Sequence, residues 1–216
     1  MHAPGAPPAA GPDTALHQVT FVVLDVETTG GTAGEAALTE VGAAAYRGGE
    51  RLGTFATLVD PGCPVPDFVS RLTGITDAMV AGAPSPAWAV RHLLEFLGDA
   101  VVVGHNLAFD LSFVDAEAGR AGLARGDNPV VDTLALARRL VRDVVPGCSL
   151  HTLSAALRLE HRPTHRALAD ALATADLLHR LIEAATGYGV LHLGELLELP
   201  ERLAPMPSRP PMLATA

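Results

Sequence analysis

The chain of 216 residues contains no lysine, so all 15 of its strongly basic residues are arginine. Acidic residues outnumber them, and the formal net charge at pH 7 is -9. A tight, static nucleic-acid binder needs a broad basic surface, because phosphate contacts supply much of its affinity. The composition excludes such a surface. If the protein handles nucleic acid, another source of positive charge is required, and bound metal ions are the obvious source.

Long apolar runs are also missing, since none approaches the roughly 20 residues that span a bilayer. We therefore expect a soluble protein with no membrane association. The first residues, MHAPGAPPAAGPD, lack the basic start and apolar core of a secretory signal. Only two cysteines occur, Cys63 and Cys148, and they lack the spacing of metal ligands. This usage suits a reducing, cytoplasmic location, with both cysteines as packing residues.

The length is sufficient for one sizeable domain and requires no second one. Residues 1–18 are rich in Pro, Ala and Gly, which predicts a disordered N-terminal tail. The ordered domain is expected over residues 19–199. Residues 200–216 are rich in Pro and Met, which predicts a flexible C-terminal tail, with a docking peptide as the alternative.

Three strand-like runs come first, and a Gly48-Gly49 step between the second and third is a hairpin signal. Helix and strand patterns then alternate to the end of the domain. This order predicts an α/β fold in which helices flank a mixed sheet that begins with three antiparallel strands. The predicted strands are 19–26, 39–46, 51–59 and 101–104, with strand and helix signals in 130–141; the predicted helices lie in 67–80, 84–97, 108–121, 150–157 (capped by Ser149) and 166–185.

Four acidic residues in apolar surroundings are candidates for chemistry. Asp25 and Glu27 end the run FVVLDVE, and because strand side chains alternate, both point to the same face. Alone, such a pair is more often a solvated strand edge. Asp110 follows a buried strand at the start of a helix, where the helix dipole also favours a carboxylate. Asp170 lies within an Ala/Leu-rich helix, where an ordinary exposed position is the simpler interpretation.

If these four acids converge, their repulsion must be neutralised. Two unit charges about 4 Å apart repel by roughly 4 kcal/mol at an effective dielectric near 20. Summed over four acids, this would rival the roughly 5 to 15 kcal/mol that stabilises a domain. Either some acids are protonated or cations bind. Oxygen ligands favour Mg²⁺ or Mn²⁺, and a pair of such ions is suited to phosphodiester hydrolysis.

Five segments resemble, in order, the motifs of DEDDh, or DnaQ-like, 3'-5' exonucleases. The resemblance extends over roughly residues 19–185. More narrowly, the chain resembles the exonuclease domain that some bacteria fuse to UvrC-like nucleases, including the trailing GYGVLHLGELLEL. The five segments are DVETTG (25–30), LTEVGA (38–43), LTGIT (72–76), GHNLAFDLSFV (104–114) and HRALADALAT (165–174).

The resemblance implies a ribonuclease H-like fold and two divalent ions, Mg²⁺ or Mn²⁺. Asp25 would bridge both ions, Glu27 and Asp170 would complete the site that holds the attacking water, and Asp110 would serve the other ion. His165 matches the general base, and a neutral imidazole suits that role near pH 7. In the tyrosine variant of the family the base is one residue later, where this chain has arginine; that variant is excluded.

The resemblance also implies contacts to the terminal nucleotide. His105 and Asn106 would hold it, Phe109 and Leu72 would support its base and sugar, and backbone N–H groups of two threonines would donate to it. For Phe109, core packing is an equal alternative. The two threonines are Thr28 and Thr29.

Other histidines and arginines have simpler interpretations. We expect the histidines His151, His161 and His179 to be surface or capping residues, with His161 as an alternative base. We expect the arginines Arg138, Arg139 and Arg142 to form a solvated helix face, with contact to a nucleic-acid backbone as the alternative.

The function implied is removal of 5'-mononucleotides from a free 3' end, with single-stranded DNA as the expected substrate and DNA replication or repair as the setting. An exoribonuclease is an alternative, because no group that would contact a 2'-hydroxyl can be identified. A module that binds a DNA polymerase or repair partner, with incidental nuclease activity, is supported only by the Pro/Met tail. A degenerate fold without catalysis is disfavoured, because all five catalytic positions are filled. No feature of the sequence indicates an oligomeric state.

Overall fold

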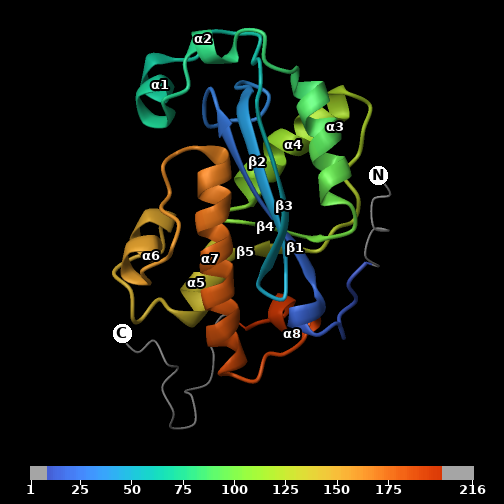
Figure 1. Ribbon diagram of the computed structural model, residues 1–216, viewed down its shortest axis with the longest axis vertical. Helices are drawn as coiled ribbons and strands as arrows, with labels where there is room; N and C mark the ends of the chain where they lie inside the picture. The colour runs from blue at the N-terminus through green and yellow to red at the C-terminus, as the bar shows by residue number, and fades with distance from the viewer. Residues whose placement is uncertain (1–8, 201–216) are drawn as a thin grey trace.

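The computed structural model describes residues 9–200, which form one layered α/β unit (Figure 1). The strands are β1 Thr20–Thr28, β2 Leu38–Arg47, β3 Glu50–Leu58, β4 Val101–Gly104 and β5 Val130–Asp132. The helices are the 3-10 helix η1 Leu16–Gln18 and the α-helices α1 Asp67–Thr73, α2 Asp77–Val80, α3 Pro86–Leu97, α4 Ala108–Arg120, α5 Thr133–Leu140, α6 Leu150–Ala156, α7 Ala167–Thr186 and α8 Leu193–Leu197.

The five strands form one mixed sheet in the order β3-β2-β1-β4-β5. The first three strands pair antiparallel, whereas β4 and β5 join in parallel. Gly48 and Gly49 both have positive φ, at 58° and 85°, so the tight turn between β2 and β3 uses a backbone that glycine adopts without steric cost. The predicted α/β fold with three leading antiparallel strands is confirmed.

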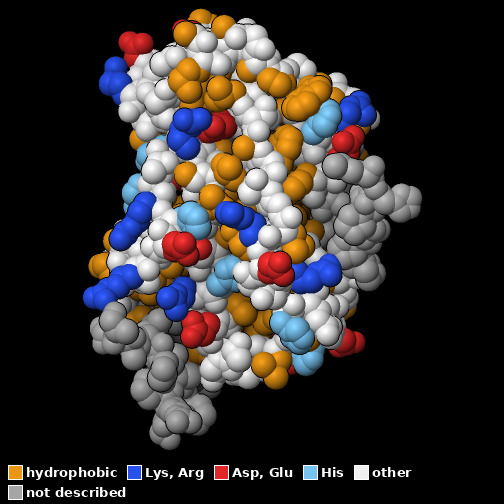
Figure 2. Space-filling model, in the orientation of Figure 1, with side chains coloured by type: hydrophobic (Ala, Val, Ile, Leu, Met, Phe, Trp, Pro, Cys, Tyr) orange, Lys and Arg blue, Asp and Glu red, His pale blue; other side chains and the backbone are white. Residues whose placement is uncertain are grey.

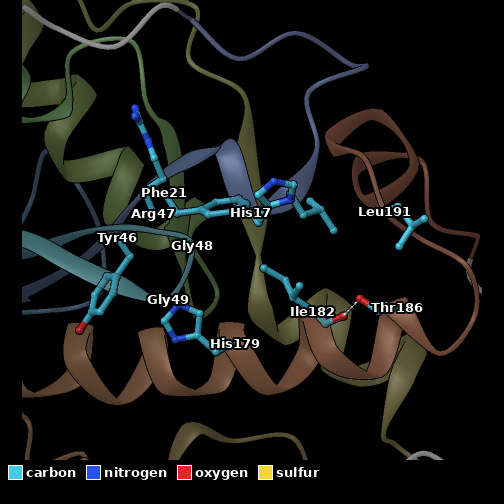
Figure 3. A pocket seen from close by; sticks show the side chains of 11 residues that line it. His17, Phe21, Tyr46, Arg47, Gly48, Gly49, His179, Ile182, Thr186 and Leu191 are labelled. Carbon is cyan, nitrogen blue, oxygen red and sulfur yellow. Dashed lines mark hydrogen bonds between the residues drawn. The ribbon is translucent and has the colours of Figure 1, made fainter.

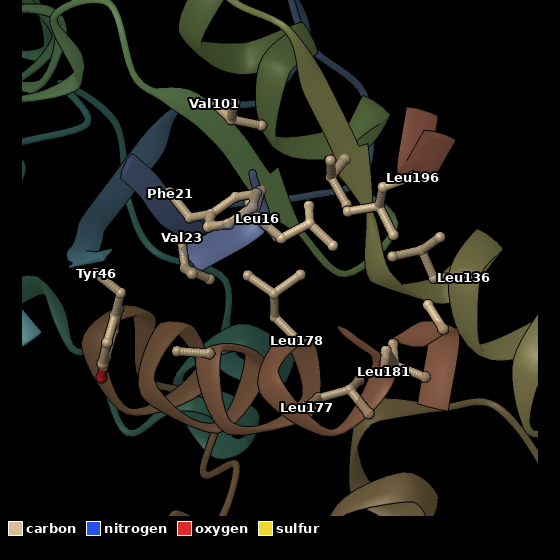
Figure 4. Close-up of a cluster of buried hydrophobic side chains, with 14 of the residues drawn as sticks. Leu16, Phe21, Val23, Tyr46, Val101, Leu136, Leu177, Leu178, Leu181 and Leu196 are labelled. Carbon is tan, nitrogen blue, oxygen red and sulfur yellow. The ribbon is translucent and has the colours of Figure 1, made fainter. Parts of the chain in front are cut away.

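β1 is the central strand, and its two faces contact different helices. Phe21 and Val23 pack in the same apolar cluster as Leu178 and Leu181 of α7 (Figure 4). The alternate residues of β1, such as Leu24, pack in a second cluster with side chains of α3 and α4. Because strand side chains alternate, Asp25 and Glu27 continue the row that faces α7.

α7 packs directly on the sheet at Gly42 of β2. A Cβ atom at this position would lie 2.3 Å from the backbone nitrogen of Leu168 and 2.4 Å from the carbonyl carbon of Ala167. Only glycine allows so close an approach. Since Gly42 is the register partner of Asp25, this contact brings the first turn of α7 beside the acidic end of β1.

The N-terminal boundary differs from the prediction of a disordered tail through residue 18. The Leu16 N–H donates to the Leu191 carbonyl at 2.9 Å, and the Leu193 N–H donates to the Thr14 carbonyl at 2.9 Å. Leu16 is buried in the α7-side cluster. The buried Leu16 and the backbone hydrogen bonds to the segment around the start of α8 therefore hold the N-terminal residues that the structure describes, from residue 9 onward. The remainder of this predicted tail, 1–8, and all of the predicted C-terminal tail after Pro200 lie outside the described residues.

The two cysteines differ from each other. Cys148 is partly buried against the α7-side cluster, as expected of a packing residue. Cys63 is exposed, so the packing prediction is wrong for this residue; it lies in the proline-rich turn after β3, where the buried side chain is that of Val65. Across residues 9–200 no helix has the length and apolar character to span a membrane.

Candidate active site

Asp110 is joined to the acidic end of β1 by a hydrogen bond. Its side chain is only 4% exposed in the first turn of α4, and its Oδ1 accepts the Val26 N–H at 2.9 Å. The register of β1 with β4 extends only to Val23, so the N–H of Val26 lies beyond that ladder. The bond connects segments 84 residues apart in the chain.

Asp170 and His165 approach the same place from α7 and the loop before it. Asp170 is 7% exposed, and its Oδ1 accepts the Thr164 N–H at 2.7 Å. His165 has φ of 57°, a left-handed conformation that is uncommon for residues other than glycine. One ligand atom from each of Glu27, His165 and Asp170 lies within 4.8 Å of the other two. The predicted convergence of these three residues is therefore present in the structure.

Electrostatic coupling shows that all four predicted acids share one cluster. Burial, followed by the charges of Asp110, Asp170 and Glu27, raises the pKa of Asp25 well above its usual range. Burial is also the main cause that raises the pKa of Glu27 to about 7 and that of Asp110 to about 7, although the hydrogen bond from Val26 opposes it at Asp110. The carboxylates thus repel one another, as the sequence argument requires.

The donor set of this cluster fits a divalent cation. It offers carboxylate oxygens and one imidazole, which suits a hard ion such as Mg²⁺ or Mn²⁺. Burial is the main cause of the raised pKa values of Asp25, Glu27 and Asp110, so the ionised carboxylates are poorly solvated. A bound cation would stabilise these ionised forms.

Glu40 and Arg166 support the cluster, and the sequence analysis assigned neither of them a role there. Glu40 is 7% exposed on β2 and is the register partner of Glu27. Its carboxylate accepts bonds from Arg166 Nη2 at 2.6 Å and Nε at 3.0 Å, and from the Ala167 N–H at 2.9 Å. These bonds attach the start of α7 to β2. A charged residue within the apolar run LTEVGAAAY is the signal that could have indicated it.

His105 and Asn106 line a cavity of about 730 Å³. Both ring nitrogens of His105 have protein partners, with Nδ1 2.9 Å from Thr133 Oγ1 and Nε2 2.9 Å from the Cys148 carbonyl. Because a carbonyl only accepts, Nε2 carries the proton. Asn106 has φ of 67°, and its N–H donates to Asp132 Oδ1 at 2.9 Å. The pair is therefore held rigidly at the cavity wall.

The other predicted nucleotide contacts have mixed surroundings. Phe109 is partly buried and its ring centroid lies 5.1 Å from that of Phe113, so the core-packing alternative accounts for part of its surface. Leu72 is 55% exposed on α1 and is free to contact a ligand. The Thr29 N–H donates to the Ala37 carbonyl at 2.9 Å, so the prediction that this group is offered to a nucleotide is wrong. The backbone pairing between β1 and the segment before β2 extends one residue past Thr28, so the N–H of Thr29 already has a partner.

The remaining histidines lie outside the acidic cluster. His151 is exposed as expected, and its ring centroid lies 5.0 Å from that of His165. His161 is half-buried, and its Nδ1 lies 3.0 Å from a carboxylate oxygen of Asp176 on α7. This contact holds the His161 ring away from the acidic cluster. His179 is half-buried and packs edge-to-face on Tyr46, with ring centroids 5.2 Å apart, so a surface or capping role does not describe it.

A second, mostly apolar cavity of about 250 Å³ lies at the other end of β1 (Figure 3). It is lined by residues of η1, β1, the β2–β3 turn with the end of β2, the C-terminal half of α7 and the segment before α8, including Phe21, His179 and Leu191. None of the predicted site residues lines it. The acidic cluster and this cavity are therefore separate features.

Fold and site together define a nuclease domain, and this chain belongs to the RNase_T family of exonucleases, whose model matches residues 22–178. It is 44% identical over 202 residues to a Mycobacterium tuberculosis (strain CDC 1551 / Oshkosh) protein provisionally named a bifunctional exonuclease/endonuclease; the match covers 90% of this chain and 31% of that protein. It is 39% identical over 190 residues to the DNA polymerase III PolC-type of Latilactobacillus sakei subsp. sakei (strain 23K), covering 85% of this chain and 13% of the polymerase. The chain thus spans less than a third of these relatives.

Solved structures agree with this assignment. Exonuclease X in complex with 5' overhanging duplex DNA matches with a TM-score of 0.61 and 26% identity, over 77% of this chain and 93% of that one. E. coli Exonuclease I in complex with a dT13 oligonucleotide matches with a TM-score of 0.66 and 21% identity, over 76% and 41% of the two chains, and supports the fold alone. The ribonuclease H-like fold and the DnaQ-like exonuclease resemblance are confirmed. Fusion to a UvrC-like nuclease stays a prediction.

Proposed function

We propose that this domain is a 3'-5' exonuclease that depends on two divalent metal ions, Mg²⁺ or Mn²⁺, and releases 5'-mononucleotides from single-stranded DNA ends. The observation that carries the proposal is the approach of Glu27, His165 and Asp170 within 4.8 Å at a carboxylate cluster. Bound ions at such a cluster supply positive charge to the phosphate and lower the pKa of water. Exonuclease X, which is 26% identical to this chain, was solved in complex with 5' overhanging duplex DNA, and this supports a DNA substrate.

The residues of the chain have distinct roles in this proposal. Asp25, Glu27, Asp110 and Asp170 would hold the cations. His165 would remove the proton from the attacking water, because its imidazole lies beside Glu27 and Asp170 on the loop before α7. The neighbouring ring of His151 restricts the positions that the His165 ring can adopt.

The terminal nucleotide is proposed to lie between α1 and the start of α4. Leu72 is exposed for contact with its base or sugar, and the uncovered part of Phe109 offers a stacking surface. His105 and Asn106 would border the nucleotide as rigid wall groups. Thr28 remains a candidate contact through its backbone.

Association with a DNA polymerase or a repair nuclease is a further proposal at the level of the whole protein. The name of the PolC-type relatives supports a polymerase, and the exonuclease/endonuclease name of the Mycobacterium tuberculosis relative supports a second nuclease, with repair as our own proposal; each relative is much longer than this chain. The exoribonuclease alternative has no structural observation in its favour and is separated by the assay below.

The test is degradation of 5'-labelled oligonucleotides of one sequence, as single-stranded DNA, duplex DNA and RNA, with Mg²⁺ or Mn²⁺. We expect stepwise shortening from the 3' end, fastest on single-stranded DNA. Asp110→Asn should lower kcat by about a thousandfold or more, equivalent to about 4 kcal/mol of lost transition-state stabilisation. Asp99→Asn, an exposed acid before β4, is the control and should match the unmodified protein. Full activity of a folded Asp110→Asn variant would disprove the site assignment.

A further inference from the structure

The cavity of about 730 Å³ that His105 and Asn106 line is a groove beside the acidic cluster. It lies between the end of β4, the C-terminal half of α5 and the start of α6. We call it the α5 groove; its lining includes His105, Asn106, Arg138, Arg142 and residues between 145 and 150. Only His105 and Asn106 among these belong to the proposed active site. The segment between α5 and α6 is thus an additional surface whose role the cluster does not explain.

Both walls of the α5 groove lead to the acidic cluster. On one wall, Asn106 accepts the Phe109 N–H at 3.0 Å in the turn that begins α4, and Asp110 follows at once. On the other wall, Leu150 precedes His151, whose ring centroid lies 5.0 Å from that of His165. A chain lying in the groove would therefore reach the cluster at its end.

The groove carries positive charge that the protein leaves unpaired. Arg138 and Arg142 are exposed, and neither takes part in an ion pair among the described residues. Burial lowers the pKa of His105, and the Arg138 charge adds to this effect, which places that guanidinium near the imidazole. Asp132, whose charge acts on His105, already accepts the N–H groups of Asn106 and Leu134.

The wall that faces these arginines is fixed before any ligand binds. The two bonds of His105 connect the end of β4 to α5 and to the Cys148 carbonyl, so the segment before α6 is anchored. Ser149 Oγ accepts the Thr152 N–H at 3.2 Å and caps α6. Basic side chains are also frequent along the left edge of Figure 2, where Figure 1 places α5 and α6. A rigid, basic groove loses little entropy when it binds an extended anion.

We propose that the α5 groove binds the sugar-phosphate backbone of the strand that leads to the 3' end, with Arg138 and Arg142 contacting phosphates upstream of the scissile bond. This inference rests on the proposed exonuclease function. A planar guanidinium donates two parallel hydrogen bonds to a phosphate. Phosphate contacts are independent of base sequence, as a degradative enzyme requires. In a chain of net charge -9 without lysine, such a local basic track supplies attraction that the whole surface does not.

The test compares two substrates that differ in whether they reach the groove. A single-stranded 12-mer DNA extends along it, whereas thymidine 5'-monophosphate p-nitrophenyl ester occupies the terminal position alone. In the Arg138→Gln/Arg142→Gln double variant, we expect KM for the 12-mer to rise about tenfold more than KM for the ester. Arg139→Gln, on the same helix but outside the groove lining, is the matched control and should change neither value.

Binding without turnover separates this proposal from the exonuclease proposal. With Ca²⁺ in place of Mg²⁺, fluorescence anisotropy of the 12-mer should show that the double variant lowers the slope of log Kd against log salt by about 1.4, since each phosphate contact in a single strand contributes about 0.7. An unchanged slope, or equal effects on the 12-mer and the ester, would overturn the groove assignment. A lower Tm without a change in slope would also overturn it, because it would show that the two arginines only stabilise the end of α5 and the turn that follows. Failure of the unmodified protein to cleave either substrate would instead refute the exonuclease proposal.

Discussion

Asp110 illustrates how a single carboxylate can favour binding of a cation and also destabilise the fold. Its hydrogen bond from the Val26 N–H stabilises the ionised form, whereas burial and the charge of Glu27 favour the neutral form. Burial prevails, and the pKa rises to about 7. Functional sites commonly contain acids with such raised pKa values, because carboxylates placed to bind a ligand are buried and repel one another when the ligand is absent. The same reasoning applies to Glu27, whose pKa also rises to about 7.

The pH dependence of the metal-free protein follows from these values. Glu27 and Asp110 have a pKa of about 7 when folded, above the ordinary values of 4.5 and 3.8. Their stabilising contribution is therefore complete below about pH 4 and is lost as the pH rises to about 7. In EDTA, Tm measured by circular dichroism should fall between pH 5 and pH 8. Mg²⁺ or Mn²⁺ should raise Tm more at pH 8 than at pH 5.

The control for this experiment is Asp110→Asn, which cannot ionise at that position. Its Tm in EDTA should vary less with pH, and the gain in Tm with metal ions should be smaller. A metal-induced gain that is the same at both pH values, or the same in the variant, would contradict the electrostatic account of the cluster.

The contact between α7 and β2 positions half of the candidate site. Asp170 lies in the first turn of α7, and His165 lies two residues before that helix. Two features of β2 locate this helix start: the missing Cβ of Gly42, and the bonds that Glu40 accepts from Arg166 and the Ala167 N–H. β2 therefore contributes to the site by fixing α7, although the sequence analysis gave it no catalytic residue.

Gly42→Ala tests this positioning. The added Cβ would meet backbone atoms at 2.3 Å and 2.4 Å, so the start of α7 must shift. We expect a loss of about 1–3 kcal/mol in the free energy of unfolding, as for other overpacked sites. We also expect a lower kcat, because His165 and Asp170 move with the helix. Urea denaturation and the oligonucleotide assay measure the two effects.

Gly53→Ala is the matched control, because it is also a strand glycine and its added Cβ would come no closer than 3.9 Å to a side-chain atom of Phe96. It should retain both stability and activity. If Gly42→Ala retained full activity, the packing of α7 on β2 would not position the site.

In the proposed function, the charge of the complete chain makes cations important for substrate binding as well as for chemistry. With 24 acidic residues against 15 basic ones, the protein repels a polynucleotide at long range. The acidic cluster adds local repulsion at the position where the proposed scissile phosphate must lie. The α5 groove and bound divalent ions are the two sources of attraction in the proposed function.

Removal of divalent ions should therefore weaken binding and not only catalysis. Fluorescence anisotropy of a labelled single-stranded 12-mer should give a Kd at least about tenfold higher in EDTA than with Ca²⁺, a difference of about 1.4 kcal/mol. NaCl adjusted to equal ionic strength is the control, because general screening also changes long-range repulsion. Equal affinity with and without Ca²⁺ would show that ions at the cluster do not contact the substrate.

Much of the fold and the candidate residues could be predicted because they depend on local patterns. The apolar, strand-like run at 19–26 and the Ala/Leu-rich run at 166–185 predicted β1 and α7 to within two residues at each end. Acids in apolar surroundings identified Asp25, Glu27, Asp110 and Asp170 as candidates, because an unpaired buried charge is too costly to keep without a role. These properties depend on neighbours along the chain.

Other features required the packed structure, because they depend on contacts between distant segments. Glu40 stands out locally as an acid in an apolar run, but its partners, Arg166 and the Ala167 N–H, lie more than half of the chain away and cannot be identified from its neighbours in sequence. The ordering of residues near Leu16 depends on a partner segment beyond α7, which composition cannot reveal. Cys63 is exposed whereas Val65, two residues later, is buried, and only the packed structure distinguishes the two. The amino-acid sequence alone thus established which side chains were candidates for the site. Three-dimensional packing determined which of them lie together, because burial and charge repulsion depend on distances in space and not on separation along the chain.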